Sequence, residues 1–281
     1  MFVVTACCLA MAAGVALAFR WRGYRFGPPM WAASDQNPSA LRRTQGLVWM
    51  LSVGALTGIL VGALVVGPGA RLAMRLLAAT SPQAQGRITE ADQVIGNITA
   101  SGTLGILIFV GLPAGVAVAV TYVLAAFGLP PGATGGALYG LVVLVVFASR
   151  LDPLRAENPD FDIVGPGWLS VLTFTTLAVI TGATVACFSG RLAAALPPPR
   201  PWWTLWLVPL SFLTIMSLVL GEPWLAAAVV VGGAVYVLAG PLSRSRPMLE
   251  RSGVLAMRAL LAAIALTALP GFASAAFEIV T

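Results

Sequence analysis

Charged side chains that could do chemistry gather in residues 150–168, between two long apolar runs. Carboxylates can bind a divalent cation or act as a general base, and guanidinium groups bind phosphate and carboxylate groups. Prolines within the stretch restrict its backbone, so we expect a shaped connection rather than a flexible linker. The six charged residues are Arg150, Asp152, Arg155, Glu157, Asp160 and Asp162.

A metal site is one chemistry that this stretch could support. Asp160-Phe161-Asp162 is a D-x-D pair, and such a pair can hold a divalent ion beneath a phosphate. An EF-hand loop is excluded, because Val164 and Val171 stand where that loop needs oxygen ligands. Two acids at this spacing are weak evidence, so we expect neither a metal nor a cofactor.

A second group of charges follows the turn-like sequence Gly67-Pro68-Gly69. Arg71 and Arg75 are four residues apart and therefore lie on one face of a helix. The pattern predicts a short helix in the membrane interface, with both guanidinium groups toward lipid phosphates or toward an acidic loop. The alternative is an arginine pair that binds a ligand.

The two charged stretches allow two further interpretations. In the first, the arginines pair with the acids of residues 150–168 and join the neighbouring spans at the surface. In the second, they bind a lipid headgroup or a small solute between the two loops. The ligand-binding residues of this second interpretation are Arg71, Arg75, Arg150, Asp152, Arg155, Glu157, Asp160 and Asp162.

The residue types that the chain lacks exclude several functions. All 16 basic residues are arginine, with no lysine and no histidine. A retinal Schiff base and a Walker-A phosphate loop need lysine. His-ligated haem, the common catalytic zinc sites and Ser-His or Cys-His nucleophile pairs need histidine. The three cysteines, Cys7, Cys8 and Cys187, have no C-x-x-C spacing, so we expect no disulfide framework.

The composition is that of a membrane protein. Hydrophobic residues make up 59% of the chain and charged residues only 9%. No polar block is long enough to bury a core of its own. We therefore expect an all-α fold, a polytopic transmembrane helix bundle that forms a single domain over residues 1–281.

Apolar runs predict about eight spans. The basic cluster at Arg20, Arg22 and Arg25 directly follows the first span, so its N-terminus is expected outside, with a cleaved signal peptide as the alternative. Glu222 is expected in a turn at headgroup level, or else as a buried functional carboxylate. The predicted spans are 1–19, 46–66, 89–127, 132–149, 166–188, two within 202–240, and one from about 253 to the C-terminus.

Local signals refine three of these spans. Thr89 followed by acids predicts the start of the third span, and Pro113 predicts a bend in it. Leu129 to Gly132 predicts a tight turn between the third and fourth spans. Glycines at spacing four indicate close helix packing in the second and fourth spans. They are Gly54, Gly58 and Gly62, and Gly132, Gly136 and Gly140.

The distribution of charge orients this bundle. With both termini outside, 11 of the 16 arginines lie on the cytoplasmic side, as the positive-inside rule requires. Eight of the ten acids lie outside. We therefore expect the polar side chains that could bind a ligand or catalyse a reaction to lie mostly in the two outer loops, residues 67–101 and 150–167.

The two charged stretches also carry a family resemblance. The segments are R-L-D-P-L-R-x-x-N-P-D-F-D-x-x-G-P-G-W-L and, upstream, G-P-G-x-R-L-x-M-R-L-L-A-A-T. Over roughly residues 46 to 190 the chain resembles uncharacterised multi-pass membrane proteins of high-GC Gram-positive bacteria. The resemblance implies a multi-pass protein of the bacterial cytoplasmic membrane and carries no assigned activity.

We expect a protein that binds or moves a lipid or small solute at its extracytoplasmic face. One alternative is a structural or assembly subunit with a membrane protein partner. Another is an enzyme on a lipid-linked substrate, using Glu157, Asp160 or Asp162 as base or metal ligand. An enzyme is the less favoured reading, and no nucleic-acid partner is expected. The lack of mid-membrane charge weighs against a proton-coupled transporter.

Overall fold

A computed structural model of the chain is all-helical apart from turns and one isolated β-bridge in the part that it describes. The described residues are 2–27, 39–89, 94–149, 154–155, 158–196 and 247–280, with only the backbone described for 40, 161, 162 and 247–252. The all-α expectation is confirmed for these residues.

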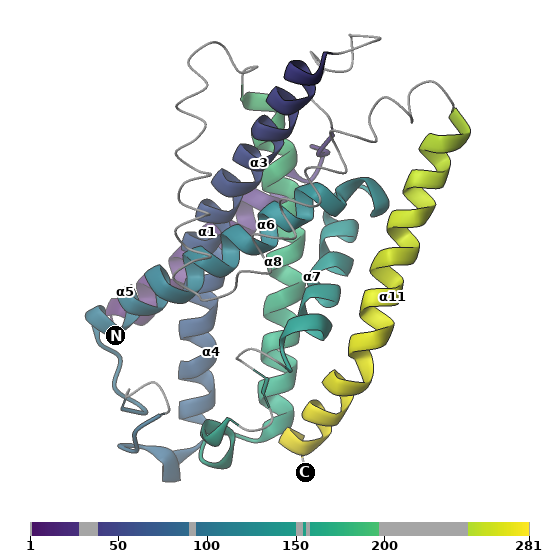
Figure 1. Cartoon of the computed structure of the whole chain (residues 1–281). Helices are drawn as coiled ribbons and strands as arrows, with labels where there is room; N and C mark the ends of the chain where they lie inside the picture. Colours follow the sequence, from purple (N-terminus) through teal and green to yellow (C-terminus); the bar gives the residue numbers. More distant parts are fainter. Residues whose placement is uncertain are drawn as a thin grey trace.

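Six apolar helices form the described bundle (Figure 1). Five of them are long and apolar enough to cross a membrane, and α7 is a shorter apolar helix of 15 residues. The two spans expected within 202–240, and Glu222 with them, lie outside the described residues. The helices are α1 (Phe2–Trp21), α3 (Ala40–Val61) continued by η1 (Gly62–Val66) and α4 (Gly67–Ala79), α5 (Ala100–Ile106) continued by η3 (Leu107–Gly111), α6 (Leu112–Ala125) and η4 (Ala126–Gly128), then α7 (Ala133–Phe147), α8 (Gly167–Ala195) and α11 (Pro247–Val280).

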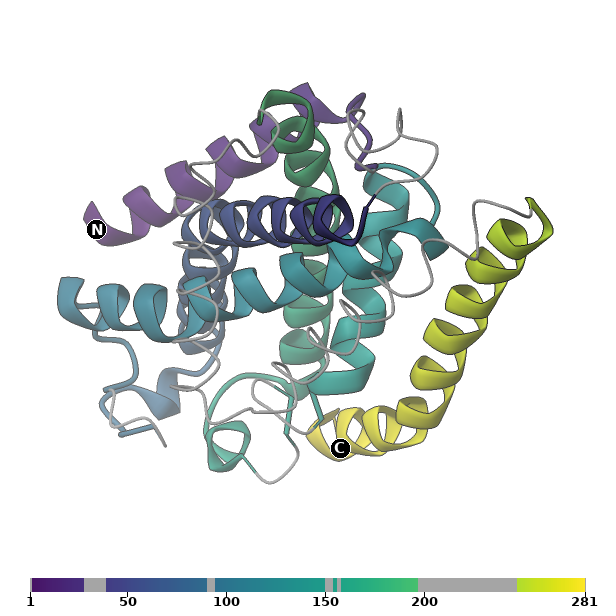
Figure 2. The same cartoon turned by 45° about the horizontal axis from the view of Figure 1, so that its top comes forward.

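The second span differs from its expected form, because no separate interfacial helix follows it. Helical structure runs without a break from Leu41 to Ala79, a length of about 58 Å at 1.5 Å per residue. Pro68 has no backbone N–H and its ring crowds the carbonyl four residues earlier. The chain accommodates it by widening the preceding turn into the π-helix η1, where the helix also bends (Figures 1 and 2).

The third span begins later than expected. Residues 94–99 are not helical, and the helix starts at Ala100 with Thr99 as its N-cap, whose hydroxyl accepts a 3.1 Å hydrogen bond from Gly102 N. The expected start at Thr89 is therefore wrong. A second π-helix, η3, lies just before Pro113, where the bend was expected. Each of the two long helices thus widens by one π turn directly before a proline.

Glycines bring the helix pairs into close contact, as their spacing predicts. A Cβ added at Gly62 would lie 2.5 Å from Gly111 O, and one at Gly111 would lie 2.8 Å from Gly67 Cα. The two π turns therefore meet at the crossing of the α3–α4 and α5–α6 helices. Gly136 and Gly140 pack against α8 in the same way, whereas Gly132 precedes α7 and has a φ of +75°.

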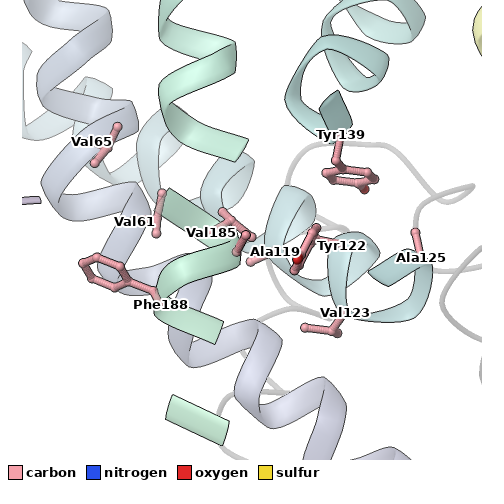
Figure 3. Close-up of a cluster of buried hydrophobic side chains, with 10 residues drawn as sticks. Val61, Val65, Ala119, Tyr122, Val123, Ala125, Tyr139, Val185 and Phe188 are labelled. Atoms are coloured by element: carbon pink, nitrogen blue, oxygen red, sulfur yellow. The ribbon is translucent and has the colours of Figure 1, made fainter. Parts of the chain in front are cut away.

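The main core lies where four helices meet (Figure 3). Buried residues of α3, η1, α6, α7 and α8 contribute to it. Tyr122 and Tyr139 contact edge to face at its centre, with ring centroids 5.5 Å apart, and Tyr139 donates a 2.6 Å hydrogen bond to Thr121 Oγ1. The cluster consists of Val61, Val65, Ala119, Tyr122, Val123, Ala125, Tyr139, Val185, Ala186 and Phe188.

The helices connect two ends of the bundle. The first end holds residues 22–27 and the 129–132 turn; Gly190 of α8 packs on the backbone of Tyr24, and Gly128 packs on Met257 of α11. The second end holds residues 80–89, 94–99 and 158–166, together with the C-terminal part of α11 (Figure 1). The two stretches that the sequence singles out therefore share one end.

Candidate functional site

The two loops of the second end contact each other directly. The backbone N–H of Gly165 donates a hydrogen bond to Oγ of Ser81, which is fully buried and in turn donates to Leu77 O at 3.0 Å. Ala78 and Ala84 pack in one apolar cluster with residues 163 and 164. The loop after α4 and the loop before α8 therefore form one surface, which we call the two-loop unit.

The first half of the two-loop unit is a small hairpin rather than the start of a helix. Gly86 N donates to Ile95 O at 3.1 Å, and Ile95 N donates to Arg87 O at 2.9 Å. Gly86 and Gly96 have φ values of +82° and +87°, which L side chains rarely adopt. Glycine is therefore the residue that suits both positions of the hairpin.

The second half is anchored by apolar residues and by a capped turn. Leu154 is fully buried against α7, α8 and α11. Asn158, only 9% exposed, caps the 3-10 turn Pro159–Asp162 by accepting a 2.9 Å hydrogen bond from Asp160 N. Leu154 and Asn158 therefore fix the described part of the charged stretch just before Asp160.

Arg71 is the charged residue that the fold buries most deeply among the described residues. Its side chain is 6% exposed. The Nε atom donates a 3.1 Å hydrogen bond to Thr103 Oγ1 on α5, and the Thr103 hydroxyl donates to Thr99 O at 2.9 Å. The Nη2 atom is buried and has no hydrogen-bond partner. The Nε end of the guanidinium group is therefore held in place, whereas its Nη2 end lacks a hydrogen-bond acceptor.

Two peripheral helices flank Arg71. α1 and α5 both pack on α4, on either side of it (Figure 2). Cys7 of α1 is buried and lies close enough to the guanidinium group for an electrostatic interaction. Neither helix is deeply embedded: α5 has no fully buried residue, and α1 has two, Cys7 and Gly14.

Arg71 has no carboxylate partner among the residues that the structure describes. Burial of an unpaired charge in a low-dielectric interior costs several kcal/mol, and in proteins such charges are paired or bind an ion. The position is therefore suited to an anion. Guanidinium groups bind phosphate and carboxylate through two N–H groups at once, and Nη2 is available for such a contact.

Arg75 lies one helical turn closer to the loops than Arg71 and is exposed. It makes no hydrogen bond or ion pair with the described residues. Asp160, in the other loop, is half-buried. The side chains of Arg150, Asp152, Glu157 and Asp162 lie outside the part that the structure describes, so the pairing expected between the arginines and the acids of residues 150–168 stays a prediction.

The other sequence-predicted site residues are only partly described. Arg155 is half-buried near the fully buried Leu154. For Asp162 the backbone alone is described, in the 3-10 turn. Arg150, Asp152 and Glu157 lie outside the described residues. Within the described part of the chain, no three His, Cys, Asp or Glu side chains gather as metal ligands, and all three cysteines are free.

No protein-family model, curated protein or solved structure matches the chain.

Sequence reasoning missed the contribution of uncharged partners to the site. Thr103 belongs to a polar helix entry that can be recognised in the sequence, but its pairing with Arg71 depends on the crossing of two helices. Ser81 gave no signal beyond its position near Pro82. Cys7 lies more than sixty positions before Arg71 and carries no motif that links it to the arginine.

Proposed function

We propose that the protein binds or moves a lipid or small solute at the extracytoplasmic face of a bacterial cytoplasmic membrane. The observation that carries this proposal is the buried guanidinium group of Arg71, which has an unpartnered Nη2 atom. Ionisable residues inside membrane-spanning helices are rare and usually mark a ligand or ion pathway.

The position of Arg71 supports a site near the membrane surface. Arg71 lies eight positions before the end of α4 at Ala79, about 12 Å along the helix. The headgroup region adds about 5–7 Å on each side of the hydrocarbon core of a bilayer. A ligand at Arg71 would therefore lie at the depth of headgroups or just below them, next to the two-loop unit.

The membrane topology is part of the same proposal: the chain crosses the membrane about eight times and has both termini outside. Arg20, Arg22 and Arg25 belong to the first end, which would face the cytoplasm under the positive-inside rule. α8 finishes and α11 begins at that same end, which fits a hairpin of two spans between them. The resemblance to multi-pass proteins of high-GC Gram-positive bacteria would place the chain in a bacterial cytoplasmic membrane.

Co-purification tests the proposal. The protein is solubilised in a mild uncharged detergent, and the intact complex is analysed by native mass spectrometry. The expected result is a lipid or small solute retained in a stoichiometric amount. A stable heteromeric membrane protein partner with no retained small molecule would contradict the proposal and favour an assembly subunit.

A turnover experiment addresses the enzyme alternative. Hydrolysis or transfer of a lipid-linked phosphosugar would be measured with Mg²⁺ or Mn²⁺ and with a chelator, in the wild type and in Asp160→Asn. We expect no turnover dependent on the metal. A metal-dependent turnover that is lost in the folded Asp160→Asn protein would contradict the proposal and show that the protein is an enzyme.

A further inference from the structure

We infer that Arg71 is the phosphate-binding residue of this protein, and that the phosphate belongs to a lipid entering beside α4 from the bilayer. This inference rests on the function proposed above and names its ligand class. The recognised chemistry is a phosphate monoester or diester. The two sources of that chemistry are a lipid headgroup and a free phosphate, and the geometry favours the lipid.

The hydrogen bond from Arg71 to Thr103 orients the guanidinium group for an oxyanion. Thr103 holds Nε at 3.1 Å and is itself committed to Thr99 O, so the guanidinium plane is oriented before any ligand binds. The Nη2 atom, buried and unpartnered, is the free donor. No described carboxylate competes for it. A ligand oxygen would supply the missing acceptor and the missing negative charge together.

Arg75 extends the site toward the membrane surface. It follows Arg71 by four residues on α4, so both side chains project from one face of the helix. Arg75 is exposed and Arg71 is buried. A phosphate would meet the exposed guanidinium first and the buried one second. A free ion would have to lose its hydration to reach Arg71, whereas a lipid phosphate already lies near this depth.

The flanking helices leave a route from the bilayer. α1 and α5 pack on α4 from opposite sides and form no extensive contact with one another (Figure 2). Both carry exposed apolar side chains: Leu9 of α1, Leu104 of α5 and Ile108 of η3, which continues α5. Acyl chains can lie along such side chains while the headgroup reaches Arg71. The buried state of Nη2 requires a small displacement of α1 or α5 when the ligand enters.

Titration with defined lipids tests the inference. The full chain in dodecyl maltoside micelles is titrated with dioleoyl phosphatidic acid, with dioleoylglycerol and with inorganic phosphate, and bound molecules are counted by native mass spectrometry. We expect one phosphatidic acid per chain, with weaker binding of dioleoylglycerol and of inorganic phosphate. Equal binding of phosphatidic acid and dioleoylglycerol by the wild type would overturn the inference without any variant. Binding of inorganic phosphate as tight as that of phosphatidic acid would assign the site to a free ion.

Substitutions locate the phosphate. Arg71→Gln should weaken phosphatidic acid binding by about tenfold to a hundredfold, the range for a lost charge-assisted contact. Arg71→Lys keeps the charge without the planar fork and should lie between the wild type and Gln. Arg258→Gln is the matched control, because Arg258 also donates through Nε, to Gly128 O at 3.1 Å at the first end. Unchanged binding in a folded Arg71 variant would overturn the inference.

An internal counter-ion is the competing explanation for the free nitrogen. Glu90 and Asp92, which lie outside the described residues, are the nearest acids in the sequence to Arg71. If one of them neutralises Arg71, the double variants Arg71→Gln/Glu90→Gln or Arg71→Gln/Asp92→Asn should recover thermal stability that Arg71→Gln loses. Such recovery would overturn the inference. A retained ligand without phosphate, bound independently of Arg71, would overturn it and leave the proposed function standing.

Discussion

Arg71 Nε donates a 3.1 Å hydrogen bond to Thr103 Oγ1, and this bond joins α4 to α5 next to the crossing of the two π turns. The bond orients the guanidinium group and connects the two helices that carry the proline-associated π turns. It is also the only hydrogen bond that the Arg71 side chain makes within the part of the chain that the structure describes. The geometry of the proposed site therefore depends on Thr103.

Removal of the Thr103 hydroxyl should destabilise the protein. Thr103→Val keeps the shape of the side chain but leaves Nε of a buried guanidinium group without an acceptor, at a cost of about 1–3 kcal/mol. The apparent Tm in detergent is the measurement. Thr176→Val is the control, because the Thr176 hydroxyl bonds only to Leu172 O on its own helix. A fall in Tm of the same size in both variants would contradict the role given to Thr103.

The crossing of the π turns should not tolerate a larger residue. In Gly62→Ala the new Cβ would lie 2.5 Å from Gly111 O, so the two backbones must separate. Overpacking of this kind costs about 1–3 kcal/mol. Gly105→Ala on α5 is the matched control, since a Cβ there meets nothing within 4 Å. Its helix should gain up to about 1 kcal/mol. Thermal unfolding of both variants distinguishes packing from a general glycine effect.

The junction of the two loops should depend on Gly165. Its φ of +69° and its N–H bond to Ser81 Oγ join the loop before α8 to the end of α4. Gly165→Ala places an L side chain in the left-handed region, which costs about 1–2 kcal/mol. We expect faster amide hydrogen exchange in residues 77–86 and 158–166 together. Faster exchange in one loop alone would show that the two loops are not one unit.

The orientation of the bundle predicts which positions can be labelled from outside. Gln83 is exposed at the second end and Gly23 is exposed at the first end. In a background with all three cysteines replaced by alanine, a membrane-impermeant maleimide added to intact cells should label Gln83→Cys. It should label Gly23→Cys only after lysis. The reverse pattern would invert the topology. Asn158 is a poorer reporter because it is only 9% exposed.

Composition and apolar runs predicted the helical bundle, because a membrane-spanning helix needs a long apolar segment that is easily recognised. Spans 132–149 and 166–188 match α7 and α8 closely, although α8 continues to Ala195. Glycine spacing also predicted that α3 packs closely against another helix, and the structure identifies that helix as α6. These features depend on short-range patterns in the sequence.

The errors arose where a local signal has two possible outcomes. Gly67-Pro68-Gly69 was interpreted as a break, but a π turn absorbs the proline inside one continuous helix. Thr89 before two acids was interpreted as a helix cap, whereas Gly86 and Gly96 at positive φ form a hairpin and Thr99 caps the helix. Tertiary packing decides whether the helix continues through Pro68 and where the third span begins. A local sequence pattern carries no information on that packing.

The candidate site was predicted in part. Arg71 was selected from its spacing to Arg75, and the contact between its loop and the 150–168 stretch is present. Its burial and its threonine partner could not be predicted, because both depend on how α1 and α5 pack on α4. The acids of the 150–168 stretch remain candidate ligand-binding residues beside it.

The occupancy of the ligand retained on purification tests the central claim most directly. Native mass spectrometry would compare the wild type, Arg71→Gln and the control Arg258→Gln, all purified identically from the same cells. We predict a phosphate-bearing molecule bound at about one per chain in the wild type and the control, and largely absent from folded Arg71→Gln. The same occupancy in all three proteins would contradict the assignment of Arg71 as the ligand-binding residue.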